Sequence, residues 1–79
     1  MTKLAKISFN DWAGLMSGRI ATIHGANGTS LRYVHSRDVP ADRMFILEGR
    51  DGSKHTLDGD GTDAERLDAH FRGFQQNNA

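Results

Sequence analysis

The clearest candidates for proton transfer are Glu48 and His55. A two-residue turn at Asp51-Gly52 would place this glutamate directly opposite this histidine on the two strands of a hairpin. A carboxylate beside an imidazole can act as a general acid and base. Across a strand pair the same contact is more often structural, and no G-x-S-x-G or similar motif marks a nucleophile. We therefore expect no enzymatic activity, and no catalytic residue is assigned.

The segment 58–64 has two patterns that are typical of ligand binding. Residues 59–64 match the G-x-G-x-x-A form of the dinucleotide fingerprint, but Asp58, Asp60 and Asp63 would repel a pyrophosphate. The same carboxylates suit calcium, yet an EF-hand counted from Asp58 would need a bidentate glutamate where Ala69 stands. We interpret the segment as a turn with an acidic helix start, and we expect no cofactor.

The histidines also do not form a metal-binding pattern. His24, His35, His55 and His70 include no pair at a spacing of two or four residues and no H-E-x-x-H sequence. A zinc site would have to assemble three or four ligands from distant elements. We therefore expect no metal site.

Charge divides unevenly along the chain, although the formal net charge is zero. Residues 1–37 contain five lysines and arginines against one aspartate, whereas residues 38–79 contain five against nine acidic residues. This asymmetry can stabilise the fold by attraction between the halves, and it also predicts two interaction surfaces. The basic surface consists of Arg19, Arg32, Tyr33, His35 and Arg37, and the acidic surface consists of Asp58, Asp60, Asp63, Glu65 and Asp68.

A helix over residues 9–17 and a hairpin are predicted in the first half. Ser8 and Asp11 have the spacing of a capping box, and Gly18 is placed to end the helix. Residues 19–24 and 30–36 have the composition of strands, and the intervening loop contains an Asn-Gly turn signal. A loop of two or four residues would place Thr22 and His24 on one face with Leu31 and Tyr33.

A second hairpin is predicted from residues 44–49 and 53–57. Residues 44–47 are apolar at every position, which indicates a central strand that is covered on both faces. The terminal helix supplies one cover, and either the first helix or a second copy of the chain supplies the other. A homodimer is therefore one expectation for this protein.

The terminal helix is predicted from a capping box at Thr62 and Glu65 and from an apolar stripe. Gly73 is expected to end it, leaving residues 75–79 as a disordered polar tail. The stripe consists of Ala64, Leu67, Phe71 and Phe74. Together these elements predict one small α+β domain over residues 1–79 in the order α-β-β-β-β-α, with a four-stranded antiparallel sheet made from two hairpins.

The composition favours some classes of protein over others, but it indicates no particular reaction. The chain has 79 residues and no cysteine, and it shows neither a signal peptide nor a membrane-spanning run, so we expect a cytoplasmic protein without membrane contact. We expect a non-enzymatic protein–protein interaction module that acts by stoichiometric binding. Proteins of this size class suggest an accessory or inhibitor protein of a phage or mobile element, directed at host defence machinery. The acidic surface would suit a basic, nucleic-acid-handling partner.

The alternative is a small nucleic-acid-binding protein that uses the basic first hairpin. Arginines beside an exposed tyrosine on a sheet can neutralise phosphates and stack bases. The sequence pI of about 6.9 is low for this class, so nucleic acid is the less favoured partner.

Overall fold

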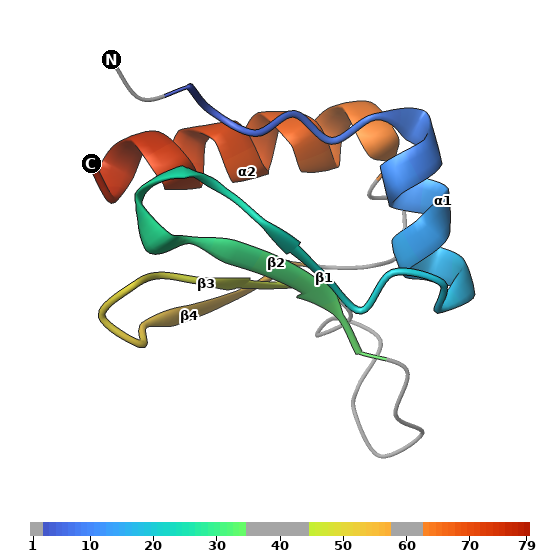
Figure 1. Cartoon of the computed structure of the whole chain (residues 1–79), viewed down its shortest axis with the longest axis horizontal. Helices are drawn as coiled ribbons and strands as arrows, with labels where there is room; N and C mark the ends of the chain where they lie inside the picture. The colour runs from blue at the N-terminus through green and yellow to red at the C-terminus, as the bar shows by residue number, and fades with distance from the viewer. Residues whose placement is uncertain (1–2, 35–44, 58–62) are drawn as a thin grey trace.

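The computed structural model describes residues 3–34, 45–57 and 63–79 and shows an α+β fold with the predicted element order (Figure 1). A nine-residue helix, a four-stranded antiparallel sheet and a fourteen-residue helix follow one another along the chain. The helices are α1 (Phe9–Ser17) and α2 (Ala64–Asn77), and the strands are β1 (Thr22–His24), β2 (Ser30–Tyr33), β3 (Phe45–Glu48) and β4 (Lys54–Leu57). The α-β-β-β-β-α prediction is thus confirmed.

The sheet has the strand order β1-β2-β3-β4, so β1 and β4 form its edges. Figure 1 shows α2 lying across one face of this sheet, with α1 at one end of the same layer. The core between them contains apolar side chains from both helices, the sheet and the segment before α1. Its buried members are Ile7, Leu15, Leu31, Phe45, Leu47, Leu67 and Phe71.

Apolar residues of β3 face this core on one side only. Phe45 and Leu47 are buried, whereas Ile46 on the opposite face is half-buried. The core that contains Phe45 and Leu47 also contains residues of both described helices, so these helices do not supply the second cover that the sequence predicts. Met44, which completes the predicted apolar run, lies outside the described residues.

The first hairpin turns through three residues, a short 3-10 turn η1 (Ala26–Gly28). The Gly25 amide donates to the Thr29 carbonyl at 2.8 Å, and Asn27 and Gly28 take the positive φ angles that close the loop. Thr22 therefore pairs with Arg32, one residue away from the predicted register. A shift of one residue exchanges the two faces of a strand, so the predicted faces of this hairpin are wrong.

The second hairpin shows the same three-residue loop. The Gly49 amide donates to the Ser53 carbonyl at 2.9 Å, and Gly52 has a φ of 86°. Glu48 consequently lies opposite Lys54, and His55 lies opposite Leu47. The predicted pairing of Glu48 with His55 is wrong, because the predicted turn had two residues where the structure has three.

Within this second turn, an aspartate orders the backbone. The Ser53 amide donates to Oδ1 of Asp51 at 3.0 Å. This hydrogen bond to the ionised carboxylate lowers the pKa of Asp51 below its ordinary value. The ionised side chain therefore supports the loop geometry that sets the β3–β4 register.

The helix ends differ in how well the sequence predicts them. Ser8 and Asp11 form the expected capping box, and Gly18 ends α1 with a φ of 82°. In α2 the N-cap is Asp63, whose side chain accepts from the Arg66 amide at 2.8 Å. The predicted cap Thr62 lies outside the described residues, and the cap is one residue later than expected.

The C-terminal end of α2 contradicts the predicted disordered tail. The helix continues through Gly73 to Asn77, and the side chain of Gln75 is fully buried. Oε1 of Gln75 accepts from the Ala5 amide at 2.8 Å and from the Ala26 amide at 2.7 Å, and its Nε2 donates to the Ala5 carbonyl at 3.0 Å. Tertiary hydrogen bonds thus hold in place a polar residue that the sequence pattern places in solvent.

Candidate functional site

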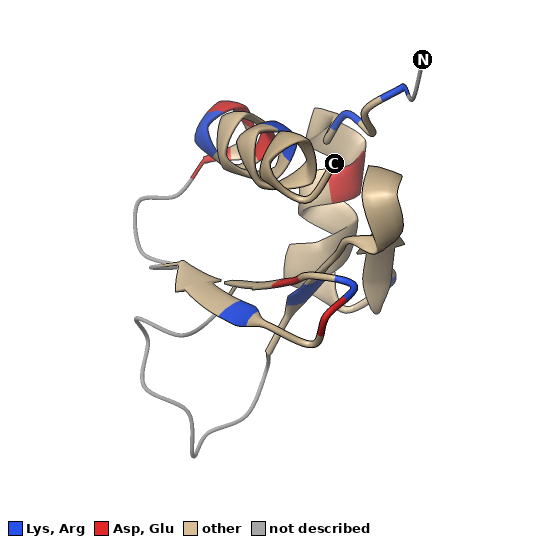
Figure 2. Ribbon diagram, turned by 90° about the vertical axis from the view of Figure 1, so that its left-hand side faces the viewer, with Lys and Arg blue, Asp and Glu red and all other residues tan. Residues whose placement is uncertain are grey.

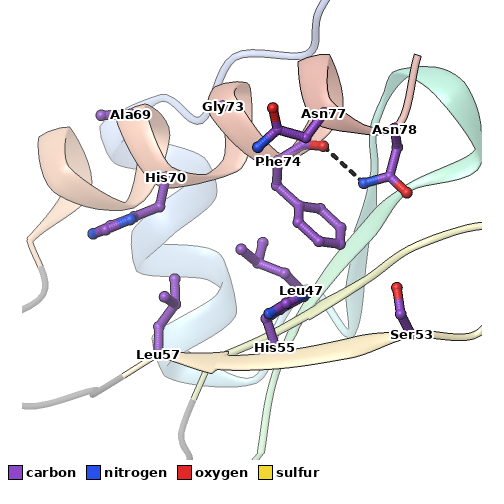
Figure 3. A pocket seen from close by; sticks show the side chains of 10 residues that line it. All are labelled: Leu47, Ser53, His55, Leu57, Ala69, His70, Gly73, Phe74, Asn77 and Asn78. Carbon is purple, nitrogen blue, oxygen red and sulfur yellow. Dashed lines mark hydrogen bonds between the residues drawn. The ribbon is translucent and has the colours of Figure 1, made fainter.

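A groove of about 560 Å³ lies between α2 and the hairpin of β3 and β4 (Figure 3). Its floor and walls combine apolar, aromatic and uncharged polar side chains with two histidines. The lining residues are Leu47, Ser53, His55, Leu57, Ala69, His70, Gly73, Phe74, Asn77 and Asn78.

The groove exists because α2 packs on the middle of the sheet and does not reach over the edge strand β4. The buried stripe of α2 includes Leu67 and Phe71, which pack into the core. On β4, in contrast, His55 is exposed and Leu57 is only half-buried, although the pleat directs both toward the helix layer. The inner face of β4 is therefore the part of the sheet that the helix leaves open.

An aromatic contact shapes the middle of the groove. The rings of His55 and Phe74 meet edge to face, with centroids 5.3 Å apart and planes at 71°. Figure 3 shows Phe74 pointing from α2 toward Leu47 and His55. His70 lies about one turn nearer the N-terminal end of α2, above Leu57. The side-chain amide of Asn78 donates to the Phe74 carbonyl at 2.9 Å and so stabilises the last turn of this wall.

Two histidines give the groove limited chemistry. His55 and His70 both have exposed side chains, and the lining contains no carboxylate that could orient either imidazole. Among the residues that the structure describes, no cluster of three or more metal-ligating side chains occurs. This arrangement suits the binding of apolar side chains and of hydrogen-bonding groups.

The β4 edge of the groove presents an unpaired backbone. Gly49 and Ser53 form a hydrogen-bonded pair, and hydrogen-bonded and non-hydrogen-bonded pairs alternate along an antiparallel ladder. His55 therefore directs its amide and carbonyl toward β3, whereas Lys54 and Thr56 direct theirs away from the sheet. In the described part of the chain, no strand pairs with this side of β4.

A second hollow, of about 490 Å³, lies on the other flank of α2, against residues 6–9. Charged side chains line much of it, and its carboxylate Asp68 accepts from the Ile7 amide at 2.7 Å. Phe9 at its border has a relative exposure of 68 % and contacts the Trp12 ring, with centroids 5.6 Å apart. This hollow lacks the apolar floor and the free strand edge of the groove.

The described members of the predicted acidic surface serve mainly the fold. Asp63 caps α2, and Asp68 holds the segment before α1 and lies 3.6 Å from the Arg72 guanidinium. Glu65 is exposed in the first turn of α2. Asp58 and Asp60 lie outside the described residues, so the structure brings together no complete acidic surface.

The described members of the predicted basic surface are separated. Arg32 and Tyr33 are neighbours on β2 and therefore project from opposite faces of the sheet. The Tyr33 ring packs at 4.8 Å from the Phe45 ring on the core side, and Arg19 is exposed between α1 and β1. His35 and Arg37 lie outside the described residues.

The sequence does not reveal the groove, although it predicts the elements to which several of the lining residues belong. Phe74 appears in the predicted helix stripe, but its position at the margin of that stripe was the only signal that it borders an opening. The two-residue turn predicted at Asp51-Gly52 pairs His55 with Glu48, whereas the structure pairs it with Leu47 on the groove side, and His70 belongs to no sequence motif. The site depends on the register of β4 and on where α2 crosses the sheet.

Comparisons of the chain with protein-family models, with curated proteins and with solved structures found no match. In the part of the chain that the structure describes, no helix has both the length and the apolar character that crossing a membrane requires. The groove and the β4 edge are therefore the features from which a function can be inferred.

Proposed function

We propose that this chain is a non-enzymatic interaction module that binds a protein partner stoichiometrically through the groove between α2 and β4. The observation that carries the proposal is the position of a groove, lined by apolar and uncharged polar side chains, beside a strand edge with which no strand of the described residues pairs. Exposed apolar surface and free backbone groups are the two features that a protein ligand can satisfy together. The groove is open along its length and would enclose little of a small ligand, which favours a macromolecular partner.

The surrounding charge supports a protein partner more than nucleic acid. The groove lining contains no lysine or arginine that could neutralise a phosphate backbone. Arg32 and Tyr33, which would have to act together on nucleic acid, project from opposite faces of β2. A role as an inhibitor of host defence machinery stays a prediction within this proposal.

The decisive experiment fills the groove without disturbing the core. Gly73 lines the groove, and a Cβ atom added there would meet no atom within 4 Å. Gly73→Phe therefore adds a ring to the helix wall of the groove without a clash at its Cβ atom. Gln76→Phe adds the same ring at an exposed position of the same helix and serves as the matched control.

Immobilised wild type and both variants would be incubated with a nuclease-treated lysate of the source organism, and the retained proteins would be quantified by mass spectrometry. We expect one partner that wild type and Gln76→Phe retain and that Gly73→Phe loses by about tenfold. Circular dichroism melting checks that both variants stay folded. Equal retention by all three proteins would refute binding in the groove.

A further inference from the structure

We propose that the groove takes an extended segment of its partner, which adds to β4 as an antiparallel fifth strand and alternates apolar and acidic side chains. This inference rests on the proposed function and specifies its binding mode and the chemistry of the ligand. The sheet has four strands, and β4 is the edge that borders the groove.

The backbone of β4 has outward-facing hydrogen-bonding groups that an added strand can pair with. The amides and carbonyls of Lys54 and Thr56 point away from β3, as the alternation from the Gly49–Ser53 pair requires. They offer two donors and two acceptors at the spacing of an antiparallel ladder. The opposite edge, β1, presents His24 and Thr22 in the same way, but it does not border the groove.

The pleat then determines which side chains of the ligand enter the groove. A residue opposite His55 projects to the same face as His55, which is the face of Leu57 and Phe74. Apolar side chains at alternate positions of the added strand would cover Leu57 and contact the Phe74 ring. Residues opposite Lys54 and Thr56 project to the other face of the sheet.

Charge favours a carboxylate at those other positions. Lys54 is exposed on the outer face, and a residue added beside it becomes its cross-strand neighbour. The other face of the added strand would meet no lysine, arginine, aspartate or glutamate, because none of these residue types lines the groove. A segment that directs carboxylates to the side of Lys54 and apolar side chains into the groove is thus complementary to both faces of the β4 edge.

A second copy of the chain fits this site less well. Antiparallel pairing of two β4 strands would satisfy the edge and place His55 opposite its counterpart. The added β4 would contribute another His55 and Leu57 on the same face, so it would lengthen the open apolar strip instead of filling it. A separate extended segment satisfies both the edge and the groove.

The probe is a short, acetylated and amidated peptide in which valine alternates with glutamate, labelled for fluorescence anisotropy. Thr56→Pro removes an outward-facing amide and leaves the hydrogen bonds between β3 and β4 intact. Thr22→Pro makes the same change at the equivalent position of the other edge and is the matched control. Gly73→Phe tests the groove.

We expect saturable binding of the peptide to wild type and to Thr22→Pro, and about a tenfold loss with Thr56→Pro and with Gly73→Phe. A peptide with lysine in place of glutamate should bind about threefold more weakly. N-methylation of the glutamates, whose amides would face β4, should abolish binding, whereas N-methylation of the valines should not. Sedimentation velocity should show monomers at the same protein concentrations.

Several results would overturn the inference. Equal binding to Thr56→Pro and Thr22→Pro would exclude strand addition at β4, and a dimer that Thr56→Pro dissolves would assign the edge to a second copy. If a lysate partner is lost with Gly73→Phe but kept with Thr56→Pro, the proposed function stands and strand addition fails. If that partner is lost with neither variant, the groove itself is not the binding site.

Discussion

The two flanks of α2 meet the rest of the molecule in different ways. Along one flank, Gln75 and Asp68 accept hydrogen bonds from the backbone of the segment before α1. Along the other flank, Phe74 and His70 face a groove whose far wall is the edge strand β4 (Figure 3). The same helix therefore holds the segment before α1 with polar side chains on one side and borders an open groove on the other.

Charged residues follow the same division. Figure 2 views the molecule with the C-terminal end of α2 toward the reader and shows lysine, arginine, aspartate and glutamate on α2, in the β3–β4 hairpin, in the N-terminal segment and on α1. We call the flank of α2 that holds the segment before α1 the latched flank. On it, Asp68 accepts a hydrogen bond from the Ile7 amide and lies beside the Arg72 guanidinium. The groove lining contains no lysine, arginine, aspartate or glutamate. Polar residues on α2 thus stabilise one flank, while the other keeps apolar surface accessible.

The largest expected effect comes from breaking the latched flank. Gln75→Ala would leave the Ala5 and Ala26 amides without their acceptor and would open a cavity in the core. We expect the free energy of unfolding to fall by about 3 kcal/mol in urea titrations. Gln76→Ala, at the exposed neighbouring position, should change it by less than about 0.5 kcal/mol. Equal losses of unfolding free energy at the two positions would show that the buried hydrogen bonds of Gln75 do not stabilise the fold.

Glycines on the two sides provide the next test, because the space around them differs. A Cβ at Gly25 would lie 2.5 Å from Phe71, 2.6 Å from Thr29 and 2.9 Å from Gln75. Gly25→Ala should therefore destabilise the fold by about 2 kcal/mol through overpacking on the latched side. Thermal and urea unfolding measure this loss, and an unchanged stability would show that this side is not tightly packed.

For an alanine substitution at Gly73 we expect the opposite effect, which is an increase in stability. The added methyl group would meet no atom within 4 Å, and alanine has the higher helix propensity. Gly73→Ala should raise the free energy of unfolding by about 1 kcal/mol. If it instead destabilises the fold, another part of the chain occupies the space that defines the groove.

The smallest effect is expected for the aromatic contact inside the groove. His55→Ala removes the edge-to-face contact with Phe74 but leaves the ladder with β3 intact. Because His55 is exposed, we expect a loss of about 0.5 kcal/mol in unfolding free energy. A loss several times larger would mean that the groove wall is part of the core.

Much of the fold could be predicted from local patterns. The capping box at Ser8 and the terminal glycine at Gly18 act within a few residues, so the ends of α1 follow from sequence. The α-β-β-β-β-α order likewise follows from apolar periodicity and turn residues. The loop lengths were not determined by these patterns, because both Asn27-Gly28 and Asp51-Gly52 are compatible with turns of two or three residues.

The candidate site was harder to predict for the same reason. One extra residue in each loop exchanges the faces of the strands, and this shift moved His55 away from Glu48 and into the groove. The helix end at Asn77 depends on Gln75, whose partners at Ala5 and Ala26 are distant in sequence. No local pattern encodes those bonds.

The sequence by itself therefore determined the elements, their order and the apolar positions that must be buried, because these depend on propensities and spacings within a few residues. Only the tertiary structure decided the strand register, the burial of Gln75 and the side of α2 that stays open. Those features depend on which distant groups satisfy each other, and on how far one helix can cover four strands.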